Sequence, residues 1–216
     1  MSDLVIHGIP GSPFLRAVMA VLEEKSATYR FQPVTPGDHR SEAYRAMHPF
    51  ARVPVIQHGD FTLYETQAIL RYLDATFSDP PLQPTDPRRA ARMDQLMGIS
   101  DWYFFPKVAG PIVFQRVVGP ALMGLVTDEA MVAAALPDAA LCIATIKSLL
   151  GDQTFLTGDT FSLADLHLYP QLFLFGLTPE GRSLMDGAPL AGWMSRMADR
   201  PCFQSTLPPP GLRDPV

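Results

Sequence analysis

Residues 4–16 have the sequence LVIHGIPGSPFLR, and this stretch decides the fold of the first half of the chain. A short apolar run ends in a loop rich in Gly and Pro, and apolar residues then recur at helical spacing from Phe14 to Leu22. This pattern predicts a strand, a loop and a helix. Ser12 is the last loop residue, so we expect its side chain at the N-terminus of that helix.

The segments that follow continue the same domain. The predicted elements are a strand at 29–34, a short helix at 41–47, a hairpin of 53–56 and 61–64 with Gly59–Asp60 at its turn, and a helix at 65–77. The order strand-helix-strand-helix-strand-strand-helix predicts an α/β domain with a mixed four-stranded sheet covered by helices.

The second half of the chain shows no strand pattern. Residues 78–87, SDPPLQPTDP, have the composition of a linker, and residues 88–118 are helical in period although Pro106 and Pro111 are expected to kink or break the helix. We therefore predict an α/β domain over 1–77, a linker over 78–87, an all-helical domain over 88–207 and an irregular tail over 208–216.

The strongest local signal in the helical domain is the segment Phe161–Leu166. Ser162 as N-cap and Asp165 three residues later form the pattern of a capping box. Capping accounts for both polar residues, so we interpret their role as structural. Thr127 or Asp128 is the expected N-cap of an Ala/Leu-rich helix over 127–150.

Composition excludes several functional classes. The 216 residues are 47% apolar and 18% charged with a net charge of −5, which is typical of a globular protein and gives no basic footprint for nucleic acid. The N-terminus lacks the pattern of a signal peptide, and no segment has about 18 uninterrupted apolar residues, so we expect a cytoplasmic protein without a membrane partner. The two cysteines, Cys142 and Cys202, have neither disulfide nor zinc spacing, so no metal is expected.

Ser12 is the first candidate for chemistry. A thiol held at a helix N-terminus shifts toward the thiolate, and a hydroxyl can donate to the charged sulfur. The window Ser12–Leu15 has no cysteine where thioredoxin-like redox proteins carry C-x-x-C, so a bound ligand must supply the sulfur. The alternative is that Ser12 only caps the helix.

Two further segments suit the remainder of a peptide-like ligand. A Val53–Pro54 pair at the start of a strand is commonly cis and can turn its backbone toward a ligand that adds as a short strand. Glu65 suits an ammonium group, and Thr66 with the first N–H groups of its helix suits a carboxylate. Both segments also fit ordinary structural roles, the second as a helix cap. Candidate cations are His39, Arg40 and Arg52, each of which is otherwise a solvated surface residue.

Together these motifs resemble the glutathione S-transferases, in particular their serine-type, phi- and theta-like branch. The resemblance covers nearly the whole chain. It is carried by Ser12–Arg16, His39–Arg40, the run HPFARVP at 48–54, the run LYET at 63–66, Ala68–Ile69, Tyr72–Leu73, Thr157–Asp159 and Phe161–Asp165. It implies a thioredoxin-like first domain that binds glutathione, an all-helical second domain that lines a pocket for a hydrophobic electrophile, a homodimer, and a role in detoxification.

The resemblance also implies residue roles. Ser12 stabilises the thiolate, Val53 pairs its backbone with the cysteinyl unit, Glu65 and Thr66 hold the γ-glutamyl end, and the cations face the glycyl carboxylate. The expected glutathione-binding residues are Phe14, His39, Arg40, Arg52, Val53, Pro54, Glu65 and Thr66. The expected electrophile site consists of Ile9, Pro10, Trp102, Phe104, Phe105, Val108 and Phe114, although aromatic clusters of this kind also form cores.

This chain departs from the family pattern at several positions. His48 stands in place of the usual Asn, Arg52 in place of Gln or Lys, and Ala51 in place of Gly, which requires only that the backbone at Ala51 be ordinary. Thr66 replaces Ser and keeps the hydroxyl. The leading hypothesis is a glutathione transferase. The alternatives are a glutathione-dependent isomerase or peroxidase that uses the same thiolate, and a non-catalytic interaction protein of the same fold.

Overall fold

The computed structural model describes residues 3–77 and 79–213, which divide into two compact units. The first unit extends to Pro81 and includes Pro201–Pro208, and the second contains Leu82–Arg200 and the described residues from Pro209 onward.

A four-stranded mixed sheet forms the centre of the first unit, as the sequence predicts. Its strands are β1 (Leu4–Gly8), β2 (Arg30–Pro33), β3 (Val55–His58) and β4 (Phe61–Tyr64), in the order β2-β1-β3-β4. β1 is parallel to β2 and antiparallel to β3, and β3 is antiparallel to β4. The β3–β4 pair is the hairpin predicted from its turn residues.

The register of the sheet brings four chain segments to one edge. Gly8 at the end of β1 is paired with Pro33 at the end of β2, and Val55 at the start of β3 is paired with Tyr64 at the end of β4. His7 is the partner of Val55 across β1 and β3. The loops that hold the predicted ligand-binding residues all leave the sheet at this edge.

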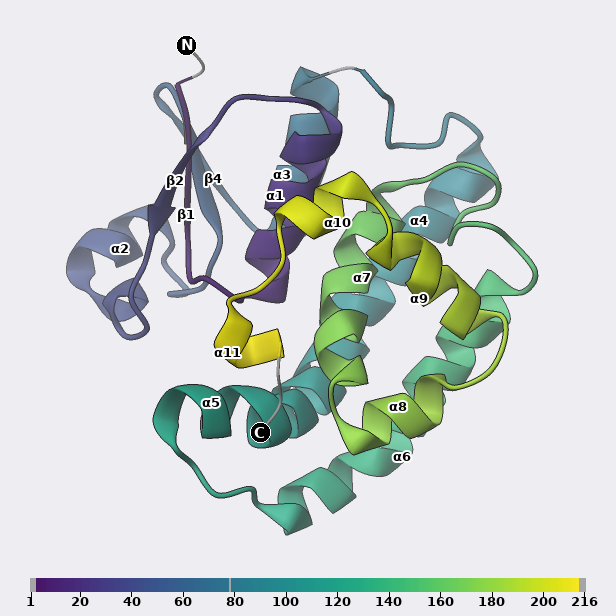
Figure 1. Cartoon of the computed structure of the whole chain (residues 1–216). Coiled ribbons are helices and arrows are strands. Elements are labelled where there is room, and N and C mark those ends of the chain that lie inside the picture. The colour runs from purple at the N-terminus through teal and green to yellow at the C-terminus, as the bar shows by residue number, and fades with distance from the viewer. Residues whose placement is uncertain (1–2, 78, 214–216) are drawn as a thin grey trace. The chain divides into compact units, whose positions relative to one another are not determined.

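Helices α1 (Pro13–Glu24) and α3 (Thr66–Thr76) lie side by side against one face of the sheet (Figure 1). α1 begins at Ser12 as N-cap with Pro13 in its first turn, and its inner face is buried at Leu15, Val18 and Leu22. The short elements η1 (Asp38–Arg40) and α2 (Glu42–Met47) connect β2 to β3.

The last part of the first unit differs from the predicted domain boundary. Helix α10 (Pro201–Ser205) packs on α1 and belongs to this unit, whereas the sequence placed it in the helical domain. Phe203 is fully buried, its carbonyl accepts a hydrogen bond from Arg16 at 3.0 Å, and the Arg16 guanidinium lies 5.6 Å from its ring. A local sequence pattern can mark Phe203 as a buried apolar residue. It does not identify the helix against which this residue packs.

The second unit is helical, as predicted. Its elements are α4 (Pro87–Ile99), η2 (Ser100–Val118), α5 (Gly119–Met123), α6 (Glu129–Leu150), α7 (Leu163–Gly176), α8 (Pro179–Met185), α9 (Leu190–Ala198) and α11 (Pro210–Arg213). α11, whose Leu212 is buried, stands where we predicted an irregular tail over 208–216; positions 214–216 lie outside the described residues. The unit begins at Leu82, inside the predicted linker, where the Leu82 carbonyl accepts a hydrogen bond from Leu163.

Helix α4 is followed directly by the wider, π-type helix η2. Pro106 and Pro111 both lie inside η2, so the chain continues to wind where the sequence predicted a kink or a break. At the end of η2 the Gly119 N–H donates to the Phe114 carbonyl five residues earlier, which is the π-type hydrogen bond.

The core of the second unit is centred on α7, and its capping box is confirmed. Asp165 is fully buried and accepts hydrogen bonds from Leu156 N–H, from the backbone and hydroxyl of Ser162, and from the Trp193 indole. Burial raises the pKa of Asp165, and these donors act against that change by favouring the carboxylate.

Among the described residues, one helix is long and apolar enough to cross a membrane by length and composition. This is α6, which has 22 residues and a mean hydropathy of 1.6 over its most apolar window. One third of that window is buried, and the buried residues of α6 include Val132, Ala139, Ile143 and Ile146. Asp128 is its N-cap and accepts from the N–H groups of Ala130 and Met131.

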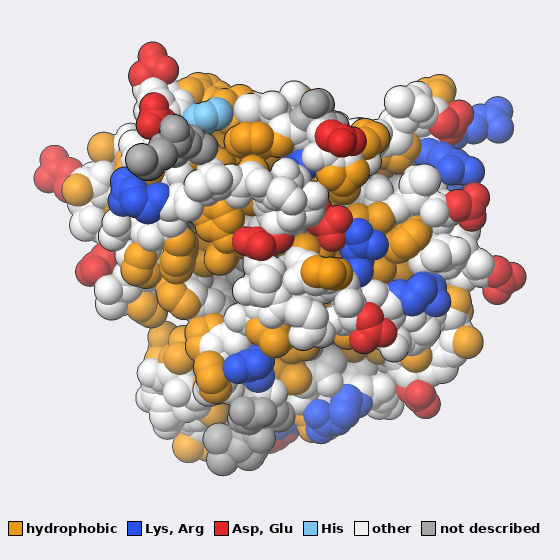
Figure 2. Space-filling view, turned by 45° about the horizontal axis from the view of Figure 1, so that its top comes forward, with side chains coloured by type: hydrophobic (Ala, Val, Ile, Leu, Met, Phe, Trp, Pro, Cys, Tyr) orange, Lys and Arg blue, Asp and Glu red, His pale blue; other side chains and the backbone are white. Residues whose placement is uncertain are grey.

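Charges are mixed on the face of the molecule seen in Figure 2. Blue and red side chains alternate there with orange apolar ones, and neither sign forms a continuous patch on that face.

Candidate active site

Ser12 lies at the N-terminus of α1, as the sequence predicts. It is half-buried at the N-cap of α1, where its Oγ accepts a long hydrogen bond of 3.4 Å from the Leu15 N–H. A hydroxyl that accepts in this way still has a proton to donate. A sulfur placed beside it lies in the positive field of the helix terminus, which lowers the pKa of a thiol. Phe14 is half-buried in the first turn of the same helix.

The Val53–Pro54 peptide bond is cis, as the sequence indicated. No backbone hydrogen bond of Val53 is found among the residues that the structure describes, so its N–H and C=O remain available to a ligand. The loop around it is held in place by two contacts. The Tyr44 hydroxyl donates to the Arg52 carbonyl at 3.0 Å. Val53 packs against a buried cluster of Val34, Tyr44 and Val55, the Tyr44 cluster. A rigid segment with open backbone groups is suited to pairing with a peptide-like ligand.

The expectation of an ordinary backbone at Ala51 is wrong. Ala51 has a φ of +52°, in the left-handed region that favours glycine. Its N–H donates to the His48 carbonyl at 2.9 Å, which closes the turn between α2 and the Val53 segment. The chain therefore keeps the turn that a glycine would form and carries a Cβ atom in it.

Glu65 and Thr66 form the other end of the site. Glu65 is exposed and has a φ of +70°, and no side chain caps the N-terminus of α3 that follows it. A non-glycine residue in such a conformation costs on the order of 1–3 kcal/mol and is typical of ligand-binding positions. The Glu65 carboxylate and the N–H groups of the first turn of α3 thus lie next to each other. This arrangement suits a ligand that carries an ammonium group beside a carboxylate.

The three predicted cations share one region of the first unit. Burial lowers the pKa of His39, and the charges of Arg40, Arg52 and Arg45 lower it further, while Asp38 opposes them. The His39 Nδ1 atom accepts from the Gly37 N–H at 3.2 Å, and within the described ranges neither Arg40 nor Arg52 forms an ion pair. This acidic protein therefore has a local positive region at the sheet edge, suitable for a carboxylate.

One functional candidate escaped the sequence analysis. The His48 ring is 2% exposed and stacks on the Tyr64 ring, with centroids 4.5 Å apart and planes inclined by 26°. Tyr64 is the last residue of β4 and directly precedes Glu65. The available signal was His48 itself, an unusual residue in the run HPFARVP, but no local pattern connects it to β4.

The residues predicted for the electrophile site divide into two groups. In the first unit, Pro10 is exposed and Ile9 packs partly against the Tyr44 cluster. In the second unit, Trp102 is 76% exposed, and Phe105 and Phe114 are half-buried.

Phe104 and Val108 have different surroundings. They are 1% and 0% exposed, and Phe104 packs edge-on against Phe175, with ring centroids 5.5 Å apart. These two side chains therefore belong to the core of the second unit and do not line an accessible surface. The exposed and half-buried aromatic residues remain the prediction for that site.

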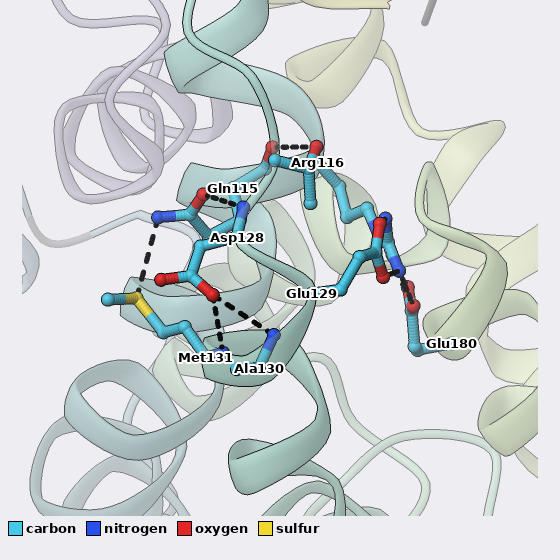
Figure 3. A network of polar contacts seen from close by, with 8 residues as sticks. Gln115, Arg116, Asp128, Glu129, Ala130, Met131 and Glu180 are labelled. Atoms are coloured by element: carbon cyan, nitrogen blue, oxygen red, sulfur yellow. Dashed lines mark hydrogen bonds and ion pairs between the residues drawn. The ribbon is translucent and has the colours of Figure 1, made fainter.

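The second unit also contains a shallow hollow of about 530 Å³ between η2, α5 and α8. Arg116 at its side is bound by two acids, with N–O distances of 2.6 Å to Glu129 and 2.7 Å to Glu180 (Figure 3). Next to it, Gln115 accepts from the Asp128 N–H and donates to the Met131 sulfur (Figure 3). The hollow contains none of the predicted site residues, and the charge of Arg116 is already neutralised by Glu129 and Glu180.

No group of three or more potential metal ligands is found among residues 3–77 and 79–213. The donor set at the sheet edge consists of a hydroxyl, backbone amides, one carboxylate and cations. Donors of these kinds suit an anionic peptide that carries a thiol.

Comparisons with known proteins identify relatives of both halves of the chain. The family described as "Glutathione S-transferase, N-terminal domain" matches residues 6–81, and "Glutathione S-transferase, C-terminal domain" matches residues 98–201. A glutathione S-transferase of Hyoscyamus muticus is 34% identical over 208 residues, which cover 94% of this chain and 96% of the relative.

Solved structures agree with these sequence matches. Glutathione transferase F7 from Populus trichocarpa has a TM-score of 0.83 and 27% identity, covering 94% of this chain and 97% of the other. A theta-class enzyme from Xanthomonas axonopodis pv. citri, solved with glutathione bound, has a TM-score of 0.80 and 27% identity, with 95% and 97% coverage.

Proposed function

Because the chain belongs to the glutathione S-transferase family, we propose that it conjugates the thiolate of glutathione to hydrophobic electrophiles, with Ser12 as the catalytic residue. The observation that carries this proposal is the sheet register. Gly8, Val55 and Tyr64 lie at one edge of the sheet, and the chain segments next to them carry Ser12, Val53 and Glu65.

Each end of glutathione has a partner in this arrangement. The Glu65 carboxylate binds the γ-glutamyl ammonium group, and Thr66 with the open N-terminus of α3 binds the adjacent carboxylate. The Val53 backbone pairs with the cysteinyl unit in the manner of a short added strand. Arg40 and Arg52 supply positive charge to the glycyl carboxylate, and the His39 imidazole, whose pKa is lowered, can donate a hydrogen bond to it.

The catalytic step requires the thiol of the bound ligand to ionise at neutral pH. The N-terminus of α1 and the Ser12 hydroxyl both favour the thiolate over the thiol, which places the chemical activation at the ligand rather than at a protein cysteine. A hydrogen bond that strengthens as charge develops on sulfur accelerates the reaction more than it tightens binding. The thiol gives its proton to solvent, and the sulfur electron pair forms the new bond to an electrophilic carbon of the co-substrate. In a substitution the leaving group departs with the electrons of the bond that breaks, and in an addition the displaced π pair takes up a proton from solvent.

The remaining features of the proposal come from family membership. We expect a homodimer, a cytoplasmic location and a role in detoxification. The electrophile contacts Ile9 and Pro10 and the accessible aromatic residues Trp102, Phe105 and Phe114. An apolar surface with few polar groups accepts many ligands, so a broad range of substrates follows from it.

Calorimetric titration with glutathione and with S-hexylglutathione tests this proposal. We expect both to bind, with the hexyl derivative tighter because its chain occupies the apolar side of the site. The same preparation should conjugate glutathione to a chloronitrobenzene, as measured by the absorbance of the product. Binding of neither compound would contradict the proposed site, and binding without conjugation across a panel of electrophiles would favour a non-catalytic protein of this fold.

A further inference from the structure

His48 lies at a junction between the two halves of the glutathione site. Its backbone N–H donates to the Tyr44 carbonyl at the end of α2, and its own carbonyl accepts from Ala51 in the turn that leads to Val53. Its ring stacks on Tyr64, the residue before Glu65. One residue thus connects the segment that presents Val53 to the segment that presents Glu65.

The aromatic contacts around His48 hold its ring in one orientation. Phe50 meets the ring edge-on at 6.2 Å and meets Tyr64 at 6.4 Å, so the three rings form one cluster. Aromatic pairs in such geometries contribute stability beyond that of the area that they bury. The cluster therefore resists a change in the relative position of the two chain segments.

The imidazole is chemically unusual for this location. Its Nδ1 atom is buried and has no hydrogen-bond partner in the described part of the chain. An unsatisfied buried nitrogen is unfavourable, and a phenyl ring would stack on Tyr64 without that cost. Packing alone therefore does not explain a histidine at this position. A role that requires a side chain to titrate between about pH 5 and pH 8 does explain it.

We propose that His48 is a positioning residue whose neutral ring aligns Val53 with Glu65, and that protonation of this ring loosens the site and weakens glutathione binding. This inference rests on the proposed function. A second proton on the ring adds a charge where the side chain is 2% exposed, and burying a charge without a partner is unfavourable. The ring must then move toward solvent and give up its contact with Tyr64.

The charged and titratable groups around His48 act in opposite directions. Burial lowers the pKa of His48 from 6.5, Glu65 raises it, and Arg52 lowers it. Tyr44 on α2 stays neutral here, because burial raises its pKa to about 12. The net effect is a neutral ring at neutral pH, which gains its proton as the solution is acidified below 6.5.

The test is the affinity for S-methylglutathione between about pH 7.5 and pH 5.5, measured by calorimetry. This ligand has no thiol, so ionisation of sulfur does not contribute to the pH dependence. We expect the wild-type protein to lose affinity as the pH falls through this range, most steeply at its acidic end, because the buried ring then takes up its proton. His48→Phe keeps an aromatic ring on Tyr64 and does not titrate, so it should retain most of the affinity at pH 7.5 and show little change with pH.

Two further variants separate positioning from other effects. His48→Ala removes the stack and should bind more weakly at both pH values, with no pH-dependent step. His39→Gln removes the other histidine near the site. Whatever its affinity at pH 7.5, this variant should still lose affinity as the pH falls to 5.5. The proposal is overturned if His48→Phe keeps the wild-type pH dependence, if His39→Gln abolishes it, or if His48→Ala binds like the wild type. A folded wild-type protein that binds no S-methylglutathione at either pH would overturn the proposed function itself, and this inference with it.

Discussion

Lys25 and Asp74 form a buried ion pair between the end of α1 and the end of α3, with Nζ and Oδ1 2.6 Å apart. Their side chains are 0% and 6% exposed, and the Lys25 ammonium also donates to the Pro80 carbonyl. The pair joins the two helices that cover the sheet and ties both to the end of the first unit.

Removal of one partner of this pair should destabilise the protein strongly. Asp74→Asn leaves the Lys25 ammonium buried without its counter-charge, so we expect a loss of about 3–5 kcal/mol in the free energy of unfolding. Replacement of both residues, Lys25→Met with Asp74→Leu, should cost less than the single change, because no buried charge remains. Urea denaturation measures both values, and equal stability of Asp74→Asn and the wild type would show that the pair contributes nothing.

Ser12→Ala should reduce turnover far more than it weakens glutathione binding. The lost hydrogen bond to a charged acceptor corresponds to about 1.5–3 kcal/mol, or about 10- to 150-fold in kcat. Steady-state kinetics and calorimetry on the same preparation separate the two effects. Ser183→Ala, on an exposed face of α8, is the matched control and should leave both unchanged. Equal turnover of Ser12→Ala and the wild type would remove Ser12 from the mechanism.

Glu65→Gln should mainly weaken binding of the tripeptide. The amide has the shape of the carboxylate and lacks its charge, so the ammonium group of glutathione loses about 1.5–3 kcal/mol, or about 10- to 150-fold in affinity. Glu42→Gln, an exposed acid in the first turn of α2, serves as the control. Unchanged affinity of Glu65→Gln in calorimetry would mean that the amino end of the ligand lies elsewhere.

Ala51→Gly should stabilise the protein. The left-handed conformation at Ala51 costs about 1–2 kcal/mol with a Cβ atom, while glycine adds about 0.4–1 kcal/mol of entropy to the unfolded chain. We expect a net gain of about 0.5–1 kcal/mol in thermal or urea denaturation. Ala46→Gly in α2 should have the opposite sign, because glycine inside a helix costs about 1 kcal/mol. Destabilisation by both substitutions would contradict this account of the turn.

The Arg116–Glu180 pair should make stability depend on acid pH. Burial raises the pKa of Glu180, but the hydrogen bonds and charge of Arg116 outweigh it and hold the pKa below 4.5. A lowered carboxyl pKa contributes stability that is complete above 4.5 and is lost as the pH falls through the lower value in the folded protein.

Glu180→Gln should therefore cost about 1–3 kcal/mol at neutral pH and progressively less as the pH falls toward about 3. The free energy of unfolding as a function of pH, from urea denaturation, measures this convergence. Glu129 also binds Arg116 but is 71% exposed, so Glu129→Gln should change stability by less than about 1 kcal/mol. A constant difference between Glu180→Gln and the wild type at all pH values would contradict the assignment.

The sequence by itself determined the local elements, because their causes are local. The alternation around Gly59–Asp60 specified the hairpin, Ser12 and Pro13 specified the start of α1, and Ser162 with Asp165 specified the start of α7. The family motifs then gave the candidate residues of the site. Each of these features depends on residues a few positions apart.

The tertiary structure decided what depends on distant partners. Register placed Val53 and Glu65 beside the Ser12 loop, burial separated Phe104 and Val108 from the accessible aromatic residues, and α10 joined α1 through Phe203. The stack of His48 on Tyr64 belongs to the same class. These features arise from packing between segments far apart in the chain, and the energy of such contacts has no signature in a local pattern.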